Sequence, residues 1–201
     1  RYRFFNIGRD HYYYDDFSNE DILQQIAGRS YIPANRMLLD LINQYKGRFK
    51  VAISISGVAL DQLEIYAPEV IDGLRELSKT GGVEFLSETY GHSLSSLIDP
   101  VEFRLQVKQH TEKIKLLFGQ EPTVLRNTEL IYSDDISDLA YKMGYRKMIT
   151  EGAKHILGWK SPNYVYQSAT STGLKLLLKN SRFSDDIAFR FSQQSWEGWP
   201  L

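Results

Sequence analysis

The sequence predicts an α/β fold in which parallel strands alternate with helices. Short apolar runs recur along the chain, amphipathic segments of helical length separate most of them, and a glycine often stands between a predicted helix and the next run. Strands joined by helical crossovers run parallel, and a parallel sheet is covered by helices on both faces or closed into a barrel. The pattern therefore predicts an α/β barrel or a doubly wound sheet.

The predicted strands are short runs rich in apolar residues. They span residues 49–55, 83–86, 123–125, 147–150 and 174–178. Each run is too short for an ordinary helix, whereas most of the segments between the runs are long enough for one and carry apolar residues at helical spacing. We expect these strands to form the sheet and the intervening helices to cover it.

The helix predicted after residue 98 has a complete start signal. Asp99 supplies a capping side chain, Pro100 suits the first helical position, and Glu102 places a carboxylate in the first turn. Phe103 and Val107 then begin an apolar row at helical spacing. Three polar residues of this helix are interpreted as a solvated surface: His110, Glu112 and Lys113.

Glycines mark the ends of the predicted helices. A glycine just after a helix adopts the left-handed backbone conformation at no steric cost, and this ends the helix. The positions are Gly47, Gly81, Gly119 and Gly144. Pro68 divides the long segment 61–79, because a proline cannot continue a helix but can open one.

Composition excludes several classes of protein. With 201 residues and 42% hydrophobic content, the chain is long and apolar enough for one domain with a real core, and we treat residues 1–201 as a single domain. Lys and Arg (24) nearly balance Asp and Glu (25), so no strong field attracts nucleic acid or anionic lipid. No apolar run approaches the roughly 18 residues of a membrane helix. We expect a soluble, cytoplasmic protein.

The chain contains no cysteine, which excludes disulfides and thiolate metal sites. We expect no cofactor and no metal. Acidic and imidazole side chains nevertheless follow four of the predicted strands: Glu88, His92, Glu129, Glu151, His155, Asp185 and Asp186. Catalytic groups of parallel α/β proteins collect at the carboxyl ends of the strands. This distribution predicts a polar active-site mouth.

Most of these residues also have a structural interpretation. Glu129 can pair with Arg126 or cap the following helix, since ion pairs often imitate sites. Ser184 followed by two aspartates, Asp185 and Asp186, is a good sequence for a helix N-cap or an Asx turn. Histidines such as His92 and His155 are more often structural than ligating. Two carboxylates at separate strand ends are stronger evidence together than either is alone. Cleavage of a glycosidic bond needs both a nucleophile or base and a proton donor.

Three stretches occur in the order and at the strand ends of a known family. They are GGVEF (81–85), RNTELIY (126–132) and SDDIAFRF (184–191), and they resemble conserved regions of glycoside hydrolase family 57, the α-amylase-like family. The resemblance spans essentially the whole chain. It implies an incomplete (β/α)7 barrel, of which this chain is the amino-terminal part, with the first conserved region of the family lying before Arg1.

The resemblance implies a retaining mechanism through a covalent glycosyl-enzyme intermediate, with Glu129 as nucleophile and Asp186 as acid/base. Retention predicts that the two carboxyl groups lie roughly 5 to 5.5 Å apart, against roughly 6.5 to 9.5 Å for inversion. Substrate contact is assigned to Glu84, His92 and Asp185, and Asp185 is also the alternative acid. Aromatic side chains are candidates for sugar stacking, or else for packing a loop over the barrel: Trp159, Tyr90, Trp196 and Trp199.

The implied substrate is an α-glucan, an oligosaccharide or polysaccharide, cleaved or transferred as in α-amylases and 4-α-glucanotransferases. Arg126 and residues 187–190 depart from the family pattern, which leaves the subsites open. A metal-dependent polysaccharide deacetylase is an alternative, because GHSLSS (91–96) resembles a His-Ser-x-x-His ligand motif in which Ser96 replaces the second histidine. A noncatalytic glucan-binding module is the other alternative.

Overall fold

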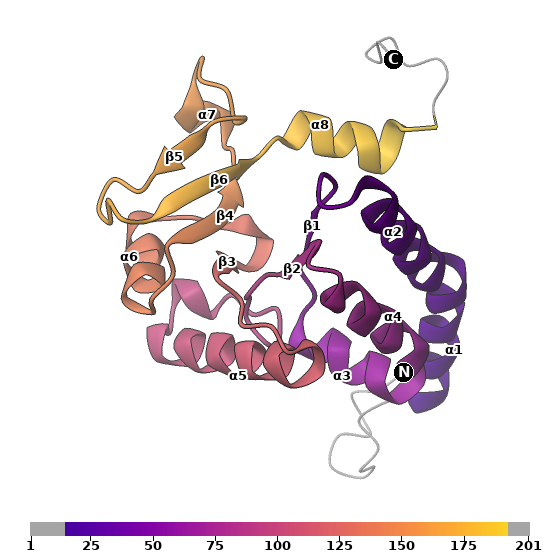
Figure 1. Ribbon diagram of the computed structural model, residues 1–201. Helices are drawn as coiled ribbons and strands as arrows, with labels where there is room; N and C mark the ends of the chain where they lie inside the picture. Colours follow the sequence, from indigo (N-terminus) through magenta and orange to yellow (C-terminus); the bar gives the residue numbers. More distant parts are fainter. Residues whose placement is uncertain (1–14, 193–201) are drawn as a thin grey trace. The chain divides into compact units, whose positions relative to one another are not determined.

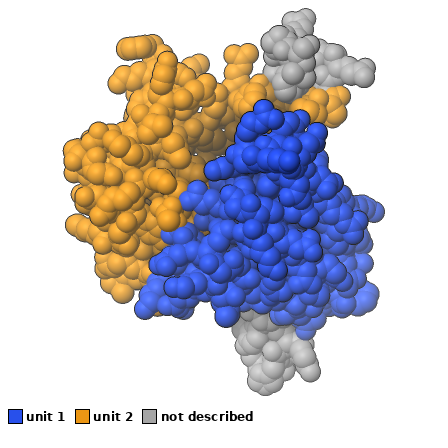
Figure 2. Space-filling view, in the orientation of Figure 1, with its two compact units in different colours: residues 1–85, 90–92, 108–122 blue, residues 86–89, 93–107, 123–201 orange. Residues whose placement is uncertain are grey.

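The computed structural model describes residues 15–192, which form helices and short strands (Figure 1). Within this part the chain divides into two compact units, coloured separately in Figure 2. The first contains residues 15–85, 90–92 and 108–122, and the second contains residues 86–89, 93–107 and 123–192. From the sequence, we expect residues 1–201 to form one partial catalytic domain. The division into two compact units does not test this expectation, which stays a prediction.

The first unit is mainly helical and contains one parallel strand pair. Its elements are α1 (Asp16–Ile26), the π-helical turn η2 (Ala27–Tyr31), α2 (Ile32–Tyr45), β1 (Val51–Ile53), α3 (Gly57–Tyr66), α4 (Pro68–Lys79) and β2 (Val83–Phe85). β1 and β2 run parallel, with Ala52 opposite Glu84. The ring of Phe85 is buried and stacks on Phe118, with the ring centroids 4.3 Å apart.

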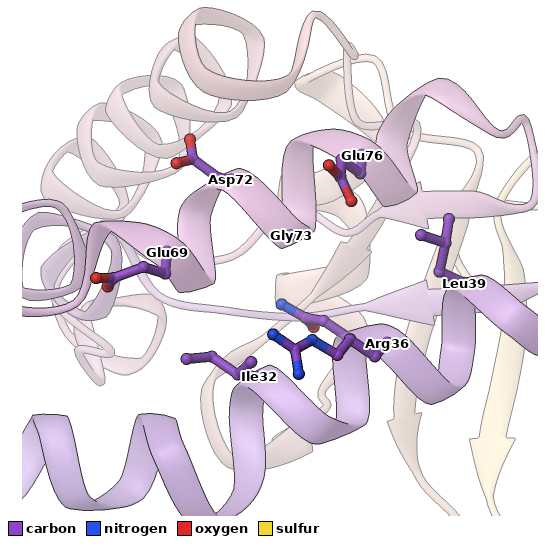
Figure 3. Close-up of a pocket in the computed structure, with 8 residues that line it drawn as sticks. Ile32, Arg36, Leu39, Glu69, Asp72, Gly73 and Glu76 are labelled. Carbon is purple, nitrogen blue, oxygen red and sulfur yellow. The ribbon is translucent and has the colours of Figure 1, made fainter.

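Helices α2 and α4 of this unit pack closely at one point and leave a small cavity beside it. At the close point, a Cβ on Gly73 would lie 2.8 Å from Nδ2 of Asn35, which donates a hydrogen bond to the carbonyl of Val70. The cavity has a volume of about 270 Å³, with Arg36 of α2 on one side and Glu69 and Glu76 of α4 on the other (Figure 3).

The second unit carries a four-stranded sheet of order β3-β4-β6-β5. Its elements are the short helix η3 (Ser95–Leu97), β3 (Val124–Arg126), η4 (Thr128–Leu130), α6 (Asp134–Lys142), β4 (Lys147–Glu151), α7 (Lys154–Leu157), β5 (Val165–Gln167), β6 (Lys175–Lys179), α8 (Ser181–Asp185) and η5 (Asp186–Arg190). β3, β4 and β6 are parallel neighbours. The predicted α/β class with parallel strands is therefore confirmed. The edge strand β5 is antiparallel and lies outside the predicted set.

Helix α5 (Pro100–Phe118) begins in the second unit and ends in the first. Its predicted start is confirmed, because Oδ1 of Asp99 accepts hydrogen bonds from the backbone N–H groups of Val101 (2.9 Å) and Glu102 (3.0 Å). Its predicted end is confirmed by Gly119, whose φ of +69° is left-handed. The division of segment 61–79 at Pro68 is also confirmed, since α3 ends at Tyr66 and α4 begins at Pro68.

Of the three polar residues of α5 expected at the surface, Glu112 is exposed, whereas His110 and Lys113 are not. His110 is fully buried, and its Nε2 lies 2.8 Å from the carbonyl oxygen of Ile55. Lys113 is largely covered and forms an ion pair with Asp61 at 2.7 Å. His110 follows Val107 by three positions and precedes Ile114 by four, so it occupies the buried row of the helix. Within residues 15–192, no helix combines the length and the apolarity needed to cross a bilayer.

Candidate active site

The second unit contains a cavity with a volume of about 760 Å³ beside the parallel strands. The loop after β3, the carboxyl end of β4, and parts of α7, β5 and β6 surround it. Its lining combines acids and an imidazole with apolar side chains: Glu129, Glu151, His155, Tyr132, Tyr166, Gln167, Ile156, Leu157 and Leu178. Apolar walls with a few polar groups are typical of sites that bind small molecules.

Glu129 reaches this cavity through an unusual backbone. β3 ends at Arg126, and the chain then turns sharply, with φ of 53° at Glu129 and 59° at Leu130. Left-handed backbone costs a residue with a Cβ roughly 1–2 kcal/mol, and two such residues in succession are rarer still. Strain of this kind persists only where the surrounding structure enforces it, and it clusters at functional sites. The predicted strand 123–125 differs from β3 by one residue at each end, and Glu129 follows the strand as expected.

Buried hydrogen bonds surround this turn. Asn127 is fully buried, and its Nδ2 donates to the carbonyl of Ile131 (2.9 Å) and to Oγ of Ser96 (3.0 Å). Oγ1 of Thr150, on β4, donates to the carbonyl of Leu130 (3.0 Å). The carbonyl groups of Leu130 and Ile131, which follow Glu129, are thus held by side chains from two separate segments of the chain.

Arg126, just before this turn, forms an ion pair with a buried glutamate. Nη1 of Arg126 lies 3.7 Å from Oε2 of Glu88, whose side chain is 2% exposed. Pairing with Arg126 is one structural interpretation of Glu129. In the structure the ion pair of Arg126 is with Glu88.

Three of the predicted rim residues line the same cavity, which confirms that they gather at the carboxyl ends of parallel strands. Glu129 follows β3, Glu151 ends β4, and His155 lies on α7. Oε1 of Glu151 accepts a hydrogen bond from the hydroxyl of Ser181 at the start of α8. Two acids and an imidazole therefore face one space.

Asp186 lies in the same unit but is not among the residues that line the cavity. It is 8% exposed, and its Oδ1 lies 2.9 Å from Nη1 of Arg190, one helical turn further along. Asp185 is half-buried at the end of α8. The helix is capped by Asn180, whose side chain accepts from the N–H of Phe183, so the interpretation of Ser184 and the aspartates as a cap is wrong. The catalytic role of Asp186 stays a prediction.

Comparison with known proteins decides the family. A sequence model described as "Glycosyl hydrolase family 57" matches residues 2–201. The chain belongs to this family. The resemblance read from the three short stretches is therefore confirmed, and the family 57 assignment covers the cavity and every predicted site residue.

This family 57 chain is similar to other proteins in sequence and to solved structures in fold. A protein of Methanocaldococcus jannaschii named "Putative alpha-amylase" is 44% identical over 190 residues, which are 94% of this chain and 40% of that protein. A 4-alpha-glucanotransferase from Thermococcus litoralis has a similar structure, with a TM-score of 0.70 and 18% identity over 85% of this chain and 27% of the enzyme. An alpha-amylase from Thermotoga maritima has a TM-score of 0.65 and 13% identity over 88% of this chain and 44% of its own. The chain thus spans less than half the length of each.

The other predicted substrate contacts of this family 57 chain belong to the first unit. Glu84 is the exposed middle residue of β2. His92 is exposed and has a left-handed φ of 52°. Substrate contact by either residue stays a prediction.

The aromatic candidates of the family 57 chain differ in their surroundings. Trp159 follows α7 and is 93% exposed, so its ring is available for stacking. The hydroxyl of Tyr90 donates to the carboxylate of Asp61 at 2.7 Å, which fits the packing interpretation. Trp196 and Trp199 lie outside the described residues.

The alternative of a metal-dependent deacetylase requires a set of metal ligands. Over residues 15–192, no group of three or more His, Asp or Glu side chains is arranged to hold a metal ion. Ser96, which stands in place of the second histidine of the deacetylase motif, accepts a hydrogen bond from Asn127. This contact gives Ser96 a structural role beside the turn that carries Glu129.

Proposed function

We propose that the protein containing this chain is a retaining glycoside hydrolase or transglycosylase that acts on α-glucans, of the α-amylase or 4-α-glucanotransferase type. Its catalytic domain would be a (β/α)7-type barrel to which this chain contributes the described strands. Membership of family 57 and the names of the relatives support this proposal. The observation that carries it is the placement of Glu129 in a strained turn at the cavity, just after a parallel strand.

In this mechanism Glu129 is the nucleophile. Its carboxylate attacks the anomeric carbon and displaces the leaving oxygen, while a carboxylic acid donates a proton to that oxygen. A covalent glycosyl-enzyme forms with inverted configuration. Water or a sugar hydroxyl then attacks the same carbon, the second residue takes up its proton, and the original configuration returns. Hydrolysis and transfer share the first half of this sequence.

Asp186 is proposed as the acid/base residue. In the structure Nη1 of Arg190 donates to Oδ1 of Asp186, so the proton for the leaving oxygen would be carried by Oδ2. Both residues belong to η5, the last helical segment of the described residues. Asp185 is the alternative donor from the same helix.

The cavity suits a carbohydrate. Apolar side chains such as Ile156 and Leu178 offer surface to the C–H faces of sugar rings, and Gln167 and Glu151 offer hydrogen bonds to hydroxyls. Trp159 is proposed to stack on a sugar outside the cavity, since its ring is exposed. An oligosaccharide or polysaccharide is therefore the proposed partner.

The complete natural protein incubated with maltooligosaccharides tests the proposal. Shorter products alone indicate hydrolysis, and a disproportionated ladder indicates transfer. Glu129→Gln should reduce turnover at least about 1,000-fold because the amide is not a nucleophile, with the circular dichroism spectrum unchanged. Glu76→Gln, at an exposed position of α4, is the matched control. Unchanged products in the wild type, or full activity in Glu129→Gln, would overturn the proposal.

A leaving group that needs no proton tests Asp186 separately. Asp186→Asn should lose most of its activity on maltooligosaccharides, roughly 100-fold or more, and much less on an aryl glycoside with a dinitrophenolate leaving group. Equal losses on both substrates would remove Asp186 from the acid role without touching the role of Glu129.

A further inference from the structure

We propose that Thr150 and Asn127 are positioning residues that hold Glu129 in its left-handed conformation at the cavity. The inference rests on the proposed role of Glu129 as nucleophile. It concerns the geometry that this role needs: a carboxylate fixed relative to the anomeric carbon, since a misplacement of about 1 Å costs roughly 100-fold in rate.

The turn does not hold its shape by intrinsic preference. Neither Glu129 nor Leu130 is a glycine or an asparagine, the residues that adopt positive φ at least cost, yet both do so. Without a constraint, relaxation of either residue to the ordinary right-handed or extended region would redirect the Glu129 side chain. Contacts outside these two residues must therefore supply the difference.

Thr150 supplies one such contact from the neighbouring strand. It is 1% exposed on β4, and its Oγ1 donates to the carbonyl of Leu130 at 3.0 Å. A Val would fill the same volume, so packing alone does not call for the hydroxyl. The bond ties the orientation of the 130–131 peptide to the sheet, and this peptide follows directly on the two strained residues.

Asn127 supplies the second contact from the other side. Its buried Nδ2 donates to the carbonyl of Ile131 (2.9 Å) and closes a loop of five residues around Glu129. The same group also donates to Ser96, which anchors the asparagine itself. Thr128 is fixed as well, because its hydroxyl lies 2.8 Å from that of Thr89. The turn is thus fastened before and after the strained pair.

The test is a comparison of Thr150→Val with Thr150→Ser in the complete protein, with maltooligosaccharides as substrate. Val keeps the shape and loses the donor, so kcat should fall about 10–100-fold while KM changes by less than about threefold. Ser keeps the donor and should retain kcat within about threefold. Thr80→Val is the matched control, because it removes a hydroxyl bond to the carbonyl of Leu77 (2.7 Å) in the other unit and should leave kcat unchanged.

The outcomes separate this inference from the proposed function. Activity surviving in Glu129→Gln would overturn the proposed function. Loss of activity in Glu129→Gln together with unchanged kcat in Thr150→Val would overturn the positioning role alone, as would equal losses in Thr150→Val and Thr150→Ser. If Thr150→Val does not yield folded protein, Asn127→Ser decides: a fall in kcat at constant KM supports the inference, and an unchanged kcat overturns it.

Discussion

The Arg126 guanidinium lies 3.7 Å from the carboxylate of Glu88, and the Glu88 side chain is almost completely removed from solvent. A carboxylate at this depth loses its hydration and depends on nearby charge and hydrogen bonds. Arg126 ends β3 just before the turn that carries Glu129. The pair therefore links a buried acid to the strand that positions the site.

Arg126→Met should lower the free energy of unfolding by about 3 kcal/mol, because it takes the cation from a buried carboxylate while keeping the length of the side chain. Urea denaturation measures the change. Lys115→Met is the control: Nζ of Lys115 lies 3.6 Å from Oε2 of Glu121, at nearly the same distance, but both side chains are mostly exposed. That variant should lose less than about 1 kcal/mol. Equal losses would contradict the importance of burial.

Two glycines should respond in opposite ways to alanine. A Cβ on Gly57, at the start of α3, would lie 2.4 Å from the ring of Tyr90, so Gly57→Ala should cost about 2 kcal/mol by overpacking. A Cβ on Gly28 would meet nothing within 4 Å, and Gly28→Ala should stabilise by about 0.5–1 kcal/mol because alanine loses less conformational entropy in a helix. Thermal unfolding measures both. A stable Gly57→Ala would show that Tyr90 moves aside at little cost.

The sequence allowed the sheet and the rim to be predicted because both follow from local patterns. Apolar runs and helix caps located the parallel strands, and strand exits then brought Glu129, Glu151 and His155 to one cavity. The edge strand β5 was not predicted, because its pairing with β6 is a tertiary contact and the segment is short and mostly exposed. The left-handed backbone at Glu129 was not predicted, because the sequence has no glycine at this turn. The contacts that hold the turn, such as the hydrogen bond from Thr150, come from residues distant in the sequence.

His110 shows an error of a different kind. Its polarity suggested a surface position, although its spacing from Phe103 and Val107 fits the apolar row of α5. The carbonyl of Ile55 satisfies the ring, so burial is possible. Periodicity was the better guide than residue type at this position.

Trp159→Ala should weaken substrate binding without affecting the fold. If the exposed ring stacks on a sugar, its removal should raise KM for maltooligosaccharides by about 2- to 10-fold, the equivalent of roughly 0.5–1.5 kcal/mol, with kcat nearly unchanged. The free energy of unfolding should change by less than about 0.5 kcal/mol, because the side chain is exposed. Trp159→Phe keeps an aromatic face and should lie between the two. An unchanged KM in Trp159→Ala would exclude stacking there.

The ionic cluster of the first unit should make its stability depend on pH at both ends of the scale. Partial burial opposes ionisation of Asp61, but hydrogen bonds from Lys113 and Tyr90 outweigh it, so the Asp61 pKa lies below its usual value of 3.8. Partial burial likewise opposes the charge on Lys113, but Asp61 and Glu64 outweigh it and raise the Lys113 pKa above 10.5. Burial and the hydrogen bond to Asp61 raise the pKa of Tyr90 to about 12.

The signs of these shifts fix the expected profile. The depressed pKa of Asp61 contributes stability above about pH 4 that is lost as the pH falls through the folded-state value. The raised pKa values of Lys113 and Tyr90 contribute stability below about pH 10 that is lost as the pH rises through their folded-state values. Lys113→Met should flatten the acid limb of the profile of unfolding free energy and remove the Lys113 contribution to the alkaline limb, while the Tyr90 contribution stays. Urea denaturation from about pH 2.5 to 11 measures the profile. Lys108→Met, whose ion pair with Glu112 is exposed and 3.9 Å long, should leave both limbs as in the wild type. If both variants give the wild-type profile, the coupling between Lys113 and Asp61 contributes nothing to the pH dependence.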